Sequence, residues 1–151
     1  MSPRPTETHP DGGPALFRLV RFWSRRWVNR TAADLTGEMR EALHVQVVEA
    51  IAAAGAGTTT ITGVAHQLGL DHSGASRMVR DAVAAGYVAR APSESDRRSA
   101  VLRLTARGRR LLADAHEWQR TVFDELTADW SETDRRRFAD YLQRISNQMR
   151  A

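Results

Sequence analysis

Four polar residues in the middle of the chain have the spacing and the chemistry to bind DNA. Their positions, i, i+3, i+4 and i+7, share one face of a helix. They are Ser73, Ser76, Arg77 and Arg80. In a major groove, short serines let bases approach closely, and an arginine can bind guanine O6 and N7 or a phosphate. The alternative interpretation of this polar stripe is a helix surface that only water contacts.

A second group of charged residues lies in the polar, turn-forming run at 92–99, between two segments that resemble β-strands. This run predicts a hairpin, or wing, whose tip carries Arg97 and Arg98. An arginine side chain is drawn into a narrow minor groove by the negative potential there. A phosphate would repel Asp96, so we expect Asp96 to support the wing by holding one arginine in a charge-assisted pair.

Helical periodicity predicts the elements that position these residues. A short helix at 61–68 and a recognition helix at 72–86 form a helix-turn-helix. Gly69 is expected in the turn between them, where a side chain would clash. Asp71 or Ser73 is expected to cap the second helix by accepting its free N–H groups.

Apolar residues on the inner sides of these helices are expected to pack the angle between them. They are Val64, Leu68, Ala75 and Met78. The β-branched segment 58–62 suits either a brief strand or the entry to the first helix. After the second helix the period changes from 3.6 to 2, which predicts strands at 87–91 and 100–105.

Further apolar helices are predicted on both sides of this lobe. Periodic stripes cover 15–30, 37–54 and 106–129, and Ser131 begins a last helix with a buried stripe from Phe138 to Met149. The predicted fold class is mainly α with a small β-hairpin wing: a winged helix-turn-helix framed by N- and C-terminal dimerisation helices. The predicted domains are a disordered arm at 1–14, N-terminal dimerisation and support helices at 15–57, a DNA-binding lobe at 58–105 and C-terminal dimerisation helices at 106–151.

Positive charge is concentrated where DNA contacts are expected. The 151 residues carry a net charge of +4, and all 22 basic residues are arginine. Residues 62–112 alone have a net charge of +5, and residues 14–33 contain five arginines and no acid. Clustered positive charge of this kind is expected where one side of a protein meets a polyanion.

Other chemistries have little support in the sequence. The chain has no cysteine, which excludes disulfides, thiolate metal sites and cysteine nucleophiles. Only Glu41 and His44 share a helical face at a metal-ligand spacing, so neither a metal nor a cofactor is expected. Because no nucleophile–base pair or phosphate-binding glycine loop occurs, we do not expect an enzyme.

No apolar run is long enough to span a membrane and no secretory signal is evident, so a cytoplasmic protein is expected.

Residues 96–108 resemble the wing signature of the MarR family of bacterial transcriptional regulators. The signature is Asp-x-Arg, three residues, an aliphatic residue, x, Leu, Thr, two residues and Gly. The matching residues are Asp96, Arg98, Leu102, Leu104, Thr105 and Gly108. Residues 64–73, together with Arg77 and 85–88, are also similar to the family's helix-turn-helix. Gly74 stands where members often carry Thr or another helix-favouring residue, so a loose first turn of the recognition helix is expected, because Gly costs about 1 kcal/mol relative to Ala in a helix.

The resemblance implies a homodimer that binds a pseudo-palindromic operator in double-stranded DNA, with recognition helices in major grooves and wings in minor grooves. It also implies that Arg98 works at the wing, with Arg97 as its neighbour. Most members are repressors. Many release DNA when a small, often aromatic or phenolic, anion binds between the dimer region and the DNA-binding lobe.

Aromatic and histidine side chains are the candidates for such an effector pocket. They are Phe17, Trp23, Trp27, His44, His116 and Trp118. The alternative interpretation is that the aromatic residues are plain core or dimer seam. The alternative to a repressor is a winged-helix module that docks to another protein and binds DNA weakly or not at all.

Overall fold

A computed structural model describes residues 11–28, 37–55, 59–93 and 100–149, except for the side chains of 23–28 and 37–40. The chain divides into two compact units, Met1–Arg40 and Glu41–Ala151. The first unit contributes helix α1, Gly12–Val28, which begins three residues before the predicted start of the helical region.

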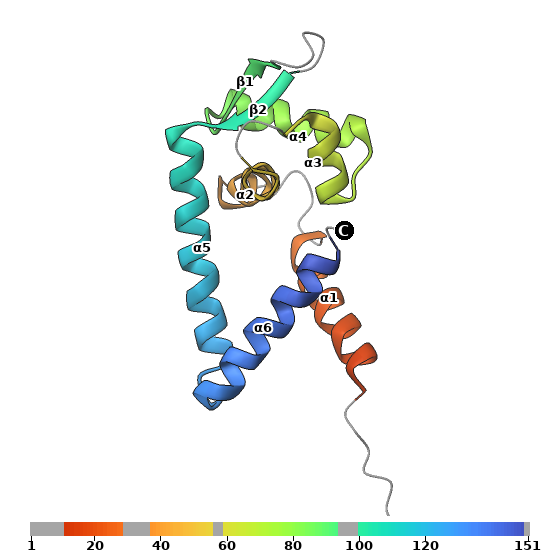
Figure 1. Cartoon of the computed structure of the whole chain (residues 1–151), viewed down its shortest axis with the longest axis vertical. Helices are drawn as coiled ribbons and strands as arrows, with labels where there is room; N and C mark the ends of the chain where they lie inside the picture. The colour runs from red at the N-terminus through yellow and green to blue at the C-terminus, as the bar shows by residue number, and fades with distance from the viewer. Residues whose placement is uncertain (1–10, 29–36, 56–58, 94–99, 150–151) are drawn as a thin grey trace, which may run out of the picture. The chain divides into compact units, whose positions relative to one another are not determined.

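The described residues form six helices and one two-stranded hairpin (Figure 1). After α1 these are α2 Gly37–Ala53, α3 Ile61–Leu68, α4 His72–Ala84, β1 Val88–Pro92, β2 Ala100–Leu104, α5 Ala106–Leu126 and α6 Glu132–Gln148. The predicted fold class, mainly α with a hairpin after a helix-turn-helix, is confirmed. The recognition helix ends at Ala84 rather than at 86, because Gly86 N–H already bonds Val83 O at 3.0 Å and the chain turns away.

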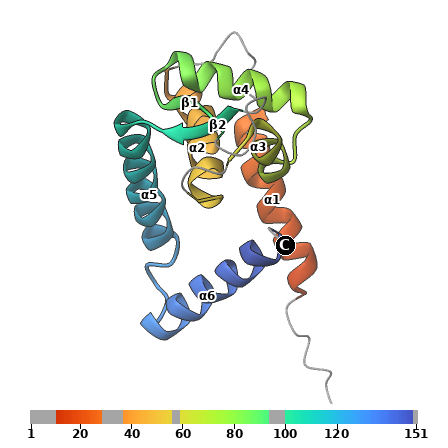
Figure 2. The same ribbon diagram turned by 45° about the horizontal axis from the view of Figure 1, so that its top comes forward.

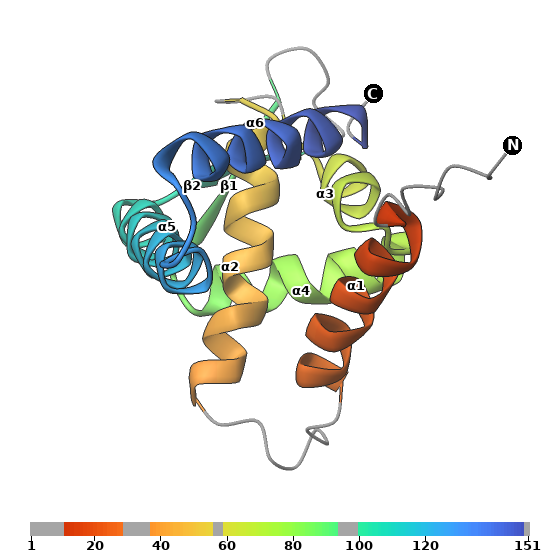
Figure 3. The same ribbon diagram turned by 90° about the horizontal axis from the view of Figure 1, so that it is seen from below.

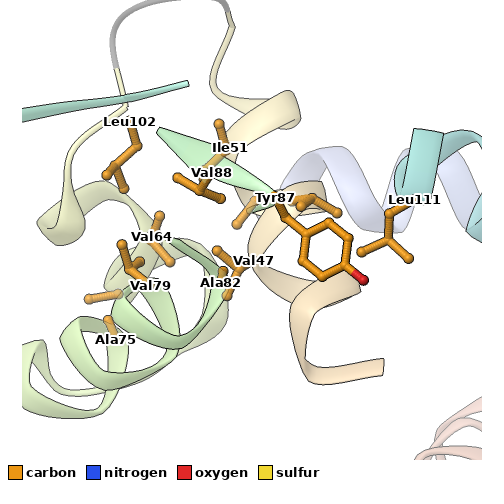
Figure 4. Packing of buried hydrophobic residues seen from close by; sticks show 13 residues of the cluster. Val47, Ile51, Val64, Ala75, Val79, Ala82, Tyr87, Val88, Leu102 and Leu111 are labelled. Carbon is orange, nitrogen blue, oxygen red and sulfur yellow. The ribbon is translucent and has the colours of Figure 1, made fainter. Parts of the chain in front are cut away.

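The core of the second unit lies where α2, α3, α4 and the hairpin meet (Figure 4). Val47, Val64 and Val79 have no exposed surface, and they come from three different helices. The predicted packing of the helix-turn-helix is confirmed, since Val64 and Ala75 are fully buried and Leu68 and Met78 pack partly buried against them. Helix α2 therefore supports the lobe directly by supplying part of its core.

The turn between α3 and α4 needs Gly69 for its backbone conformation. Gly69 has a φ of +64°, in the left-handed region that residues with a Cβ rarely adopt. A Cβ built there would meet nothing within 4 Å, so the expected steric clash is wrong. Between the two predicted caps, Asp71 is the residue that caps α4, and its Oδ1 accepts a hydrogen bond from Gly74 N–H at 2.7 Å.

The hairpin is antiparallel, with Val88 opposite Leu104 and Pro92 opposite Ala100. Both interpretations of the β-branched segment hold within the described residues. Thr59 forms a bridge with Leu102, whose N–H bonds Thr59 O at 2.7 Å, and Thr60 caps α3. The hairpin is thus attached to the lobe along one edge.

The base of the hairpin is fixed to α5 by a backbone contact at Gly108. A Cβ on this glycine would lie 2.1 Å from Tyr87 O, so no larger residue fits without movement. The cap of α5, Thr105, also reaches this point: its hydroxyl donates to Gly86 O at 2.6 Å and accepts from Gly108 N–H at 3.0 Å. The wing and the start of α5 therefore hold one another in place.

A polar and aromatic corner joins α5 to α6. Arg135 forms an ion pair with Asp124, and its Nε donates to the buried Thr127 hydroxyl at 3.1 Å. The Phe138 ring stacks on Phe123, with centroids 5.9 Å apart. The predicted cap at Ser131 is confirmed. These contacts turn the chain so that α6 runs back and ends beside α3 (Figure 3).

We expect Gly108→Ala to lower the free energy of unfolding by about 1–3 kcal/mol or more, because the new methyl group overlaps a backbone oxygen that cannot move freely. Urea denaturation of the variant measures this change. Gly63→Ala is the matched control, since its Cβ would meet Thr59 and Thr60 only at 3.8 Å. That control should be neutral or more stable by up to about 1 kcal/mol. Equal effects of the two substitutions would contradict this explanation.

Candidate nucleic-acid interface

Helix α4, which lies at the top of Figure 2, contains the residues that the sequence selects for DNA contact. Ser73, Arg77 and Arg80 are exposed, and Ser76 is half-buried. Arg80 Nε lies 3.6 Å from Asp81 Oδ1, but both side chains are well exposed and water weakens such a pair. Within the described chain Arg77 forms no ion pair, so its guanidinium group is available to a ligand.

The first turn of α4 is capped by Asp71, whose carboxylate accepts a hydrogen bond from Gly74 N–H, and the helix begins at His72. The expectation of a loose turn at Gly74 stays a prediction. A Cβ on Gly74 would lie 2.7 Å from Asp71 Oδ1, so the small residue also makes room for this close cap. Two exposed side chains, His72 and Ser73, lie in that turn.

The hairpin presents two more arginines, which the sequence-based prediction did not select. Arg90 on β1 and Arg103 on β2 are both exposed. The sequence feature that could have indicated them is a single basic residue in each otherwise apolar strand. The wing-tip residues Asp96, Arg97 and Arg98 lie outside the described residues, so their roles stay predictions.

Two arginines at the start of α5 have structural contacts. The Arg107 guanidinium lies 5.0 Å from the centre of the Tyr87 ring, a cation–π distance. Arg109 Nη1 donates to Leu104 O at 2.9 Å. Both contacts join α5 to the hairpin, so these two arginines stabilise the fold in addition to adding positive charge near the expected DNA interface.

The structure describes the side chains of four of the six predicted effector residues, and the gathering of all six at one pocket stays a prediction. Phe17 is exposed on α1, and the side chains of Trp23 and Trp27 lie outside the description. His116 Nε2 is 3.6 Å from Glu49 Oε1, whereas Trp118 is 57% exposed. His44 packs against Tyr87, with ring centroids 5.2 Å apart.

A groove that the sequence did not predict lies between α2, α3 and α6 and encloses about 380 Å³. Helices α2 and α6 each contribute positions i, i+3, i+4 and i+7, which is the spacing that could have revealed it. The lining residues are Gln46, Glu49, Ala50, Ala53, His66, Gln67, Leu68, Leu142, Ile145, Ser146 and Met149. This described lining contains none of the six predicted effector residues.

Neither a metal cluster nor a membrane span occurs among the described residues. No group of three or more His, Cys, Asp or Glu side chains in them could hold a metal ion. None of their helices combines the length and the apolar character that crossing a bilayer requires.

Comparison with known proteins finds similarity to one family. Residues 33–99 match the sequence model of the MarR family. The resemblance to the MarR family is confirmed. The matched segment contains helices α2, α3 and α4 and strand β1. No curated protein matches the chain in sequence.

Solved structures share the fold over most of the chain. Wild-type apo MarR from E. coli is 22% identical, with a TM-score of 0.62 over 92% of this chain and 98% of that one. The transcriptional regulator PcaV from Streptomyces coelicolor, solved with its natural ligand, is 22% identical, with a TM-score of 0.57 over 97% and 98%. Bordetella bronchiseptica BpsR, whose DNA binding is regulated by 6-hydroxynicotinic acid, is 18% identical, with a TM-score of 0.59 over 87% and 98%.

Asp71→Ala should lower the free energy of unfolding by about 1 kcal/mol, because the first turn of α4 loses the acceptor for Gly74 N–H. Asp71→Asn, which keeps a side-chain oxygen at that place, is the control and should lose much less. Thermal and urea denaturation measure both. An equal loss in the two variants would show that the charge of Asp71 matters rather than its cap.

Burial lowers the pKa of His44 below its usual value of 6.5, although Asp81 and Glu41 partly oppose the shift. The His44 imidazole binds a proton less readily in the folded protein than in the unfolded chain. Neutral His44 therefore contributes fully to the free energy of unfolding above pH ~6.5, and this contribution is lost as the pH falls through the lowered pKa. We therefore expect His44→Phe, which keeps a ring beside Tyr87, to make stability less dependent on pH between about 5 and 7. Urea midpoints across that range measure the slope, and an unchanged slope would exclude His44 as its source.

Proposed function

We propose that this chain is a sequence-specific, double-stranded-DNA-binding repressor that acts as a homodimer in the bacterial cytoplasm. One observation carries the proposal: the capped helix α4 presents Ser73, Arg77 and Arg80 to solvent beside an arginine-bearing hairpin. A major groove accepts an α-helix, and its base edges match the donors of arginine and serine. The similarity to solved transcriptional regulators supports this use of the surface.

The wing supplies the second part of the interface in this proposal. Exposed Arg90 and Arg103 lie along the hairpin, and the tip residues Arg97 and Arg98, supported by Asp96, would enter the minor groove. Phosphate contacts by such arginines position a protein on DNA, and base contacts from α4 would add sequence specificity.

A second copy of the chain would cover exposed apolar side chains of the C-terminal helices that lie outside the groove between α2, α3 and α6. The stripe predicted to be buried on α6 is open in the single chain, and Tyr141, which does not line the groove, is 54% exposed. Leu126 on α5 is 65% exposed. Large exposed apolar patches mark interaction surfaces. In this proposal residues 106–151 and the helices of 15–57 dimerise, residues 58–105 bind DNA, and the dimer binds a pseudo-palindromic operator.

Release from DNA by a small aromatic or anionic ligand is the regulatory part of the proposal. Two proteins of the same fold support it, since PcaV was solved with its natural ligand and BpsR is regulated by 6-hydroxynicotinic acid. The six effector residues predicted from the sequence remain candidates for that binding.

Arg77→Ala should weaken binding to the DNA upstream of the protein's own gene by about 1–3 kcal/mol. Fluorescence anisotropy at several salt concentrations measures the affinity and the number of phosphate contacts. A lower salt slope would identify a phosphate contact, and an unchanged slope with reduced specificity a base contact. Arg137→Ala is the control, because Arg137 is an exposed arginine on α6, away from the interface.

Unchanged affinity of the Arg77 variant would contradict the assignment of this residue. A wild-type chain that binds no DNA even at low salt would overturn the proposed function in favour of a protein-docking module.

A further inference from the structure

The groove between α2, α3 and α6 has an unexpected charge for a chain whose basic residues number 22. Its described lining contains one carboxylate, Glu49, and no arginine; His66 is the only other ionisable residue. A bound carboxylate or phenolate would therefore meet a like charge and no guanidinium group. Electrostatics favours a ligand of the opposite sign.

Glu49 is held in position by two residues of α5. Gln119 Nε2 donates a hydrogen bond to Glu49 Oε1 at 2.7 Å, and His116 Nε2 lies 3.6 Å from the same oxygen. The Glu49 side chain is 36% exposed, so these two contacts do not close it off from solvent. A charge that neighbouring side chains already orient loses less entropy when a ligand binds than a freely moving one does.

The rest of the groove suits an apolar body next to that charge. Leu142 and Ile145 on α6 are 38% and 41% exposed, and Leu68 closes the α3 side half-buried. Amides of Gln46 and Gln67 and the hydroxyl of Ser146 can bind polar substituents. The volume of about 380 Å³ is in the range of small-ligand pockets.

We propose that this groove binds a small organic cation, with its aromatic or aliphatic body against α6 and its positive charge at Glu49. The inference rests on the proposed function, in which a small molecule regulates the protein, and it adds the charge of that ligand and the residue that selects it. A ligand here would touch both α3 of the helix-turn-helix and α6 of the C-terminal region, so it could bias their arrangement.

Titration calorimetry of the full chain, without DNA, tests the proposal with three matched probes. Benzyltriethylammonium carries a permanent positive charge beside a ring, phenylacetate a negative charge, and benzyl alcohol none. We expect the cation to bind at least about tenfold more tightly than the anion, with the neutral probe between them.

Glu49→Gln keeps an oxygen that can accept the hydrogen bond from Gln119 but removes the negative charge. It should weaken binding of the cation at least about threefold and reduce the difference in affinity between the cation and the anion. Glu117→Gln, the same substitution at an exposed position outside the groove, should bind all three probes like the wild type. Ala53→Leu, which fills the groove from an exposed position of α2, should weaken all three.

Three results would overturn the proposal: phenylacetate binding as tightly as the cation, an unchanged preference in the Glu49 variant, or no binding of any probe. In the last case sedimentation would show whether a second copy covers the groove. DNA binding is measured separately, so the two failures can be told apart. If the chain binds the cation but no DNA, the ligand site is supported and the proposed function is contradicted. If it binds DNA but not the cation, only the ligand site is contradicted.

Discussion

The backbone contact between Gly108 and Tyr87 is the constraint on which the arrangement of the DNA-binding lobe depends. Because a Cβ at position 108 would lie only 2.1 Å from Tyr87 O, the first turn of α5 is pressed against the chain where α4 gives way to β1. The Thr105 hydroxyl bonds both Gly86 O and Tyr87 O, so the end of β2 is fixed at the same place. Helix α4, the hairpin and α5 therefore share one junction and keep a fixed relation.

The Tyr87 side chain extends this junction to α2 and to the charged surface. Its ring contacts His44 of α2 and the Arg107 guanidinium of α5, and Figure 4 shows it directed toward Leu111. Arg107 thus contributes to the fold, whereas Arg77 extends into solvent. The net positive charge of this region consequently overstates the number of arginines free to bind DNA, and only the structure separates the two groups.

Features that local chemistry determines could be predicted from the sequence, and features that distant contacts determine could not. The caps at Asp71 and Ser131 and the buried Val64 and Ala75 follow from neighbours within a few residues, and the structure has them. Gly69 lies in the predicted turn, but its left-handed backbone, and not steric crowding, explains the glycine. Both conditions select glycine, so the sequence did not distinguish them. The groove between α2, α3 and α6 was not predicted, because residues far apart in the sequence form it: Glu49 accepts a hydrogen bond from Gln119, 70 residues later.

Opposite charges on the two binding surfaces would keep their ligands apart. An anionic effector would be attracted to the same exposed arginines that are proposed to bind phosphates, so at high concentration it would compete with DNA directly. A cation is repelled by those arginines and attracted by Glu49, which the α5 residues His116 and Gln119 hold in the groove. Its effect on DNA binding would then have to pass through α3 and α6, as a change in their packing, instead of through competition for one surface.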